Sequence, residues 1–110
     1  MTIEIMNLRT DQPTEEYDVK IDRTSVLGNP YHMLNEKQRD LVCAQYEDYL
    51  KIRAAAGHLM ENRSFIKELE RLVELYKEHK QLRLFCWCAP KRCHGASIKR
   101  WVLNECHSTS

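Results

Sequence analysis

The sequence has 110 residues, a length that holds one domain over residues 1–110, and its 43% hydrophobic and 30% charged residues exclude a disordered or low-complexity chain. Lysine and arginine total 17 against 16 aspartates and glutamates, so the formal charge of +1 predicts no general attraction to nucleic acid or to an anionic membrane. No apolar run approaches the roughly 20 residues of a membrane span or the length of a secretory signal, so we expect a cytoplasmic protein.

Two strands and a structured loop are predicted at the start of the chain. Apolar and polar residues alternate in two segments separated by a polar turn, around Ile3 and Ile5 and then at Tyr17, Val19 and Ile21. Gly28, Asn29 and Pro30 are turn formers that end any strand, and Pro30 favours an extended conformation at Asn29. We therefore expect residues 22–31 to be a loop.

The rest of the chain predicts two helices, a strand and a third helix. The first helix covers about 36–56, with Asn35 and Gln38 at the spacing of a capping box. The second covers about 62–79, is capped by Asn62 or Ser64, and has the clearest apolar stripe of the sequence. Residues 82–88 are apolar on both faces apart from Arg83, which is typical of a central strand covered by helices. A last helix follows Gly95, with 104–110 as a fraying tail.

This order, β-β-α-α-β-α, predicts an α/β fold in which helices cover a small sheet of about three strands. Ligands of such sheets bind where the carboxyl ends of strands lead into loops. The loop after Ile21 and the loop after Cys88 are both in such positions. They share one edge only if the second and third strands are parallel, because antiparallel strands end at opposite edges.

Five cysteines are an odd number, and three of them fall between residues 86 and 93. We therefore expect reduced thiols rather than a disulfide framework. The set Cys86, Cys88, Cys93 and His94 has the number of ligands that a structural zinc site needs. The adjacent residues Cys93 and His94 point about 100° apart on a helix, so we expect no metal or other cofactor, with these four as the ligands if zinc is present.

Three further interpretations of the same segment remain open. Cys88 or Cys93 is a candidate nucleophile, because Lys91, Arg92 and a helix start favour a thiolate. The backbone N–H groups of Cys93, His94 and Gly95 are a candidate anion site at the start of the last helix, the interpretation that requires the fewest coincidences. The alternative is that the cysteines are small core residues and the cations face solvent.

In the other loop, Arg23, Gly28 and Asn29 are candidate contacts to a phosphate, a sugar hydroxyl or a base edge. Tyr31 is a candidate stacking platform. A turn of this composition also forms without any ligand, and Tyr31 then packs within the loop.

The two segments together resemble a known family, the small phage and bacterial domains called domain of unknown function 4326. The resemblance covers residues 17–103 and rests on Arg23, Gly28, Asn29, Pro30, Tyr31, Cys86, Trp87, Cys88, Ala89, Pro90, Cys93, His94 and Gly95. Lys91 and Arg92 are outside the pattern. The resemblance implies a stand-alone α/β domain, often carried by phages, and implies no established reaction. It favours the two motifs as two walls of one site over two independent turns.

Our leading hypothesis is a site that binds, and in one version also cleaves, a nucleotide-related or other phosphate-bearing small molecule. The ligand-binding candidates are Arg23, Gly28, Asn29, Tyr31, Cys93, His94 and Gly95. Whether the protein is an enzyme stays open. If it is one, His94 is the general acid or base, and Cys88 or Cys93 is the nucleophile. The alternatives are a phage-encoded module that sequesters a nucleotide signal or blocks a host protein, and a zinc-stabilised interaction domain.

Overall fold

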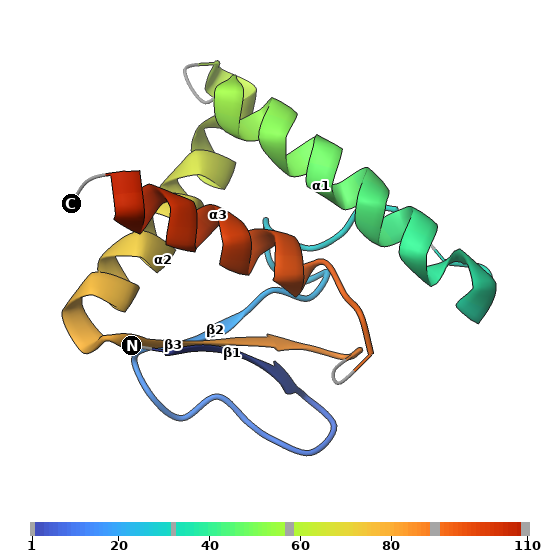
Figure 1. The fold of residues 1–110 in the computed structure, drawn as a ribbon, viewed down its shortest axis with the longest axis horizontal. Helices are drawn as coiled ribbons and strands as arrows, with labels where there is room; N and C mark the ends of the chain where they lie inside the picture. The colour runs from blue at the N-terminus through green and yellow to red at the C-terminus, as the bar shows by residue number, and fades with distance from the viewer. Residues whose placement is uncertain (1, 32, 57–58, 89–90, 109–110) are drawn as a thin grey trace.

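The computed structural model describes residues 2–31, 33–56, 59–88 and 91–108 (Figure 1). Its elements are β1 (Thr2–Asn7), β2 (Asp18–Lys20), α1 (Arg39–Ala55), α2 (Arg63–His79), β3 (Gln81–Cys86) and α3 (Gly95–Ser108), with short 3-10 turns at Glu36–Gln38 and Met60–Asn62. The predicted order β-β-α-α-β-α is confirmed. No helix in these ranges combines the length and the apolarity needed to cross a membrane.

The sheet has three strands in the order β1-β3-β2, and both outer strands are parallel to β3. Ile3 is level with Leu82 on one side of β3, and Val19 is level with Leu84 on the other. The carboxyl ends of β2 and β3 therefore lie at the same edge. The two predicted loops can therefore lie together, because the second and third strands are parallel as this arrangement requires.

The three helices lie on one face of the sheet (Figure 1), and α3 contacts both α1 and α2. Alternate strand residues face them, because successive side chains of a strand point to opposite faces. The core combines these strand residues with the apolar stripes of the helices, including Ile3, Val19, Leu82, Leu84, Tyr46, Leu50, Phe65, Leu69, Leu72, Ile98 and Val102. The central place predicted for β3 is confirmed.

Arg83, the charged residue within β3, forms an ion pair on the other face of the sheet. Arg83 donates from Nε and Nη2 to the two carboxylate oxygens of Asp18, both at 2.6 Å. Its guanidinium carbon also lies 5.6 Å from the ring centres of Tyr17 and Phe85. Desolvation raises the pKa of Asp18, but the hydrogen bonds from Arg83 and from the Thr14 and Glu15 amides outweigh it and lower that pKa. The Arg83 guanidinium lies over the ring of Phe85, which is fully buried.

Three local predictions differ from the structure. Asn62 is the N-cap residue of α2, but its side chain makes no capping hydrogen bond. The side chain instead accepts a hydrogen bond from Arg53 at 2.7 Å and donates one to the Ala56 carbonyl at 3.0 Å, so it joins α2 to the end of α1. The strand expected over 82–88 ends at Cys86. The tail expected to fray from residue 104 is helical to Ser108, because Trp101, Val102 and Cys106 continue the apolar stripe onto the core.

Candidate functional site

A pocket of about 420 Å³ lies at the carboxyl edge of the sheet, between the loop after β2, the start of α1 and the segment that joins β3 to α3. The two motifs that the sequence singled out both contribute to it. Its lining residues are Asp22, Arg23, Thr24, Asn29, Tyr31, Met33, Arg39, Val42, Cys43, Cys86, Trp87, Cys88, Arg92, Cys93 and His94. The motif residues Ala89 and Pro90 lie outside the described part of the chain.

Gly28 and Asn29 hold the first loop in shape. A Cβ atom on Gly28 would lie 2.5 Å from the Asp22 carbonyl oxygen, so only glycine allows the loop to close on itself there. The Asn29 side chain donates to the Val42 carbonyl at 3.3 Å and accepts from the Tyr31 amide at 2.9 Å. Asn29 lines the pocket, but its polar atoms fasten the loop to α1.

Arg23, Thr24 and Tyr31 are the exposed residues of this loop that line the pocket, and of these Thr24 is bonded through its hydroxyl to Asp22. Within the described residues, no carboxylate forms an ion pair with Arg23. The Tyr31 ring is 37% exposed and meets the Tyr49 ring edge-to-face at 6.0 Å. The side chains of Arg23 and Tyr31 are placed where a ligand in the pocket could reach them.

Asp22 joins the two loops directly, a role that the sequence analysis did not assign. Its carboxylate is buried and accepts from the Trp87 indole N–H at 3.1 Å and from the Thr24 amide at 3.2 Å. Desolvation raises the pKa of Asp22, but the bonds from Thr24 and Trp87 and the charge of Lys20 outweigh it and hold the pKa below its usual value. The signal available in the sequence was a carboxylate at the end of a strand, next to a motif arginine.

His94 is a buried anchor. Its Nε2 donates to the Ile21 carbonyl oxygen at 2.5 Å, and its ring lies 4.9 Å from the Tyr46 ring. Burial lowers the pKa of His94, so the ring is neutral near pH 7 and adds no positive charge to the pocket. The bond to Ile21 fixes the tautomer and leaves Nδ1 as the only ring nitrogen that can accept a proton.

At the start of α3, backbone N–H groups form hydrogen bonds within the same short segment. The Gly95 amide donates to Cys93 Sγ at 3.3 Å, and the Ala96 and Ser97 amides donate to the Cys93 and His94 carbonyls at 3.2 and 3.1 Å. A Cβ on Gly95 would lie 3.0 Å from Ile21 Cδ1, so this glycine makes room for the core rather than for a ligand. Of the three amides predicted to bind an anion, that of Gly95 is therefore already bonded to Cys93, and the helix start also contributes its dipole field.

Four of the five cysteines, Cys43, Cys86, Cys88 and Cys93, line the pocket, and none of the five is in a disulfide bond in the described structure. Cys86 and Cys93 are buried with their sulfur atoms 3.2 Å apart, and Cys88 is partly exposed. Bonds from the Cys86 thiol and the Gly95 amide lower the pKa of Cys93. The contact with Cys86 and burial raise the pKa of Cys88 strongly, despite the nearby Arg39. Of the two predicted nucleophiles, Cys93 favours the thiolate and Cys88 is the more accessible.

The geometry gives no support to a zinc site at Cys86, Cys88, Cys93 and His94. No three histidine, cysteine or acidic side chains converge as metal ligands in the described ranges. The His94 Nε2 atom is bonded to a backbone carbonyl instead.

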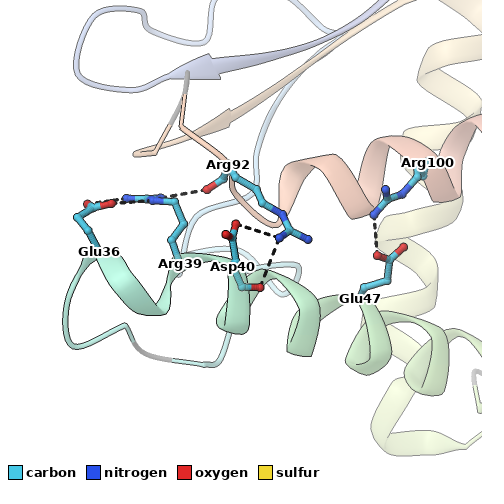
Figure 2. A network of polar contacts seen from close by, with 6 residues as sticks. All are labelled: Glu36, Arg39, Asp40, Glu47, Arg92 and Arg100. Atoms are coloured by element: carbon cyan, nitrogen blue, oxygen red, sulfur yellow. Dashed lines mark hydrogen bonds and ion pairs between the residues drawn. The ribbon is translucent and has the colours of Figure 1, made fainter.

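Arg39 and Arg92 attach the start of α1 to the segment before α3 (Figure 2). Arg39 donates to both Glu36 carboxylate oxygens at 2.9 and 2.8 Å and to the Arg92 carbonyl at 3.0 Å. Arg92 donates to Asp40 Oδ1 at 3.0 Å. The bonds from Arg39 lower the pKa of Glu36 to about 2. The sequence did not indicate Arg39, because an arginine in a charged helical segment is ordinarily a solvent-facing residue.

Fold and pocket together define a small parallel α/β domain with a cationic, partly aromatic pocket at the carboxyl edge of its sheet. The family model described as Domain of unknown function (DUF4326) matches residues 6–104, so the chain belongs to this family. The resemblance inferred from the two motifs is confirmed, and the match begins before β2. No curated protein and no solved structure matches the chain.

Proposed function

We propose that the pocket binds a small anionic molecule that carries a planar ring, with a nucleotide-related ligand as the best fit. The observation that supports this is the convergence of both family motifs on one pocket, whose lining includes the guanidinium groups of Arg23 and Arg92 and the rings of Trp87 and Tyr31. Its volume of about 420 Å³ is within the range of small-molecule sites.

The anionic part of the ligand is assigned to Arg23 and Arg92. Arg23 is exposed and forms no ion pair with the described carboxylates. The partner of Arg92 is Asp40, whose side chain is 84% exposed, so water can replace Arg92 there when a phosphate binds the guanidinium. Arginine suits this role because its planar donors match two phosphate oxygens at once. Arg39 also lines the pocket, but its guanidinium is committed to Glu36.

The planar part of the ligand is assigned to Trp87. Its side chain lines the pocket and is 51% exposed, while the bond from the indole N–H to Asp22 limits how the ring can turn. Stacking of a base on an aromatic ring stabilises binding by roughly 1–3 kcal/mol. Val42 and Cys43 of α1 supply apolar lining for the same part of the ligand.

Binding without cleavage fits the side chains better than turnover. His94 is buried with one nitrogen held by Ile21, Cys88 favours the protonated thiol, and Cys93 is only 5% exposed. Because no side chain exposed enough to meet a nucleotide-sized ligand is prepared as nucleophile or base, we expect a bound nucleotide to be recovered unchanged after the protein is denatured.

The test is a calorimetric titration with purine and pyrimidine nucleoside mono-, di- and triphosphates, with inorganic phosphate and free nucleosides as comparison ligands. Arg23→Gln should weaken the tightest nucleotide by about tenfold to a hundredfold, the effect of one charge-assisted hydrogen bond. Arg63→Gln, an exposed arginine at the start of α2 outside the pocket, is the matched control and should change nothing. Failure of every nucleotide to bind more tightly than phosphate, or equal effects of the two variants, would refute the proposal.

A further inference from the structure

We propose that Cys86 and Cys93 form a dithiol redox site at the inner end of the pocket, which a hydroperoxide entering the pocket oxidises to a disulfide. The proposal rests on the sulfur geometry and is independent of the nucleotide hypothesis. Cys86 Sγ and Cys93 Sγ lie 3.2 Å apart, and both residues line the pocket. A disulfide bond is about 2.05 Å long, so the two atoms need to approach by only about 1 Å.

Cys93 is the thiol placed to react first. As a thiolate, its sulfur accepts a hydrogen bond from the Cys86 thiol 3.2 Å away, and the Gly95 amide donates to it at 3.3 Å. Cys93 also lies two residues before the positive end of α3. These contacts favour its thiolate, and the pKa of Cys93 is lowered accordingly. Because Cys93 is 5% exposed and borders the pocket, a small oxidant can reach it more readily than a protein thiol can.

The other cysteines are less suited to this reaction. Burial raises the pKa of Cys43, which lies in α1, and the pKa of Cys88 is also raised. Cys106 lies near the far end of α3 and does not line the pocket. The 3.2 Å separation of Cys86 and Cys93, together with the lowered pKa of Cys93, therefore favours this pair among the five thiols.

The reaction balances in two steps. The Cys93 thiolate attacks one peroxide oxygen, the O–O bond breaks, and the Cys93 sulfenic acid forms while the other oxygen leaves and takes a proton as water or an alcohol. Cys86 then loses its proton and attacks Cys93 Sγ, the S–O bond breaks, and the oxygen leaves as water. The two thiols supply the two electrons that reduce the O–O bond.

Peptide mapping of the full chain tests the assignment. The reduced protein is treated with hydrogen peroxide in the presence of a chelator, and the free thiols are then alkylated. We expect the mass before alkylation to fall by about 2 Da, as two thiol hydrogens are lost. Trypsin cuts after Arg83, Lys91, Arg92 and Lys99, so Cys93 is separated from the peptide that carries Cys86 and Cys88. Fragmentation of the linked peptides should place the bond at Cys86.

Variants separate this pair from its neighbours. Cys86→Ser and Cys93→Ser should abolish the link, whereas Cys88→Ser and Cys106→Ser, which keep the pair, should retain it. In Cys86→Ser, a sulfenic-acid trap such as dimedone should label Cys93, because the second thiol is missing. A link through Cys88, or alkylation of both Cys86 and Cys93 in peroxide-treated wild-type protein, would overturn the proposal without reliance on any variant.

Discussion

Replacement of Asp22 by asparagine tests the connection between the two loops. In the folded chain the Asp22 carboxylate accepts from Thr24 Oγ1 and the Thr24 amide on Oδ1, and from the Trp87 indole on Oδ2. An amide keeps one acceptor oxygen for Thr24 but turns an N–H₂ group toward the Trp87 N–H. The variant therefore loses one charge-assisted bond and gains a contact between two donors.

The size of the loss follows from the surroundings of the bond. Hydrogen bonds to charged groups contribute about 1.5–3 kcal/mol. Because the Trp87 side chain is 51% exposed, water can replace its lost acceptor. We therefore expect the free energy of unfolding of Asp22→Asn to fall by roughly 1.5–2 kcal/mol at pH 7.

The stabilisation that the Asp22 carboxylate contributes should decrease in acid. The pKa of Asp22 is lower in the folded chain than its ordinary value of 3.8. Its stabilisation is therefore fully present above that ordinary value and is lost as the pH falls through the folded pKa. Urea unfolding followed by circular dichroism at pH 7 and near pH 2 should show the gap between wild type and Asp22→Asn shrinking in acid. Asp48→Asn, an exposed control on α1, should show a gap below about 0.5 kcal/mol at pH 7. An Asp22→Asn gap as small as that of the control, or one unchanged in acid, would refute the reasoning.

Three further substitutions test the frame of the site. Gly28→Ala should unfold at a lower temperature than Gly95→Ala in a thermal melt. A Cβ at Gly28 would meet backbone atoms at 2.5 and 2.8 Å, whereas a Cβ at Gly95 would meet the flexible tip of the Ile21 side chain at 3.0 Å. The reverse order of unfolding temperatures would contradict these contacts. Tyr46→Phe removes the buried bond from the phenol to the Leu27 carbonyl at 2.7 Å and should cost about 1–3 kcal/mol in urea unfolding, and no loss would show that the carbonyl finds another donor. Leu69→Ala in the fully buried stripe of α2 should cost roughly 2–5 kcal/mol by the same measurement, and a loss below about 0.5 kcal/mol would show that the stripe is not core.

The sequence was sufficient to predict the fold class, because its signals are local and periodic. The apolar stripe around Leu69 and Leu72 marks α2 without any tertiary information, and the apolar run at 82–86 marks the central strand. The strand order β1-β3-β2 is not encoded in this way, since it depends on which strands meet after the chain returns through two helices. The end of α3 was missed because packing on the core outweighs the tendency of a terminal segment to fray.

The sequence predicted which two segments line the pocket, but not which contacts their individual residues make. Both motifs line the pocket, since parallel strands bring their following loops to one edge. Gly95 and His94 look alike in a motif whether they bind a ligand or fasten a helix, and the bond to Ile21 distinguishes the two cases for His94. Asp22 and Arg39 gain their roles through partners 65 and 53 residues away in sequence, which no local pattern records.

A double-mutant cycle between the two loops tests most directly whether they form one ligand site. Arg23→Gln, Arg92→Gln and the double variant are titrated by calorimetry with the nucleotide that binds wild type most tightly. If both guanidinium groups bind the same phosphate group, the double variant should be weakened by less than the product of the two single factors, because the loss of either contact changes what the other contributes. Single factors that multiply without coupling, or an Arg92→Gln variant that binds like wild type, would contradict a shared site.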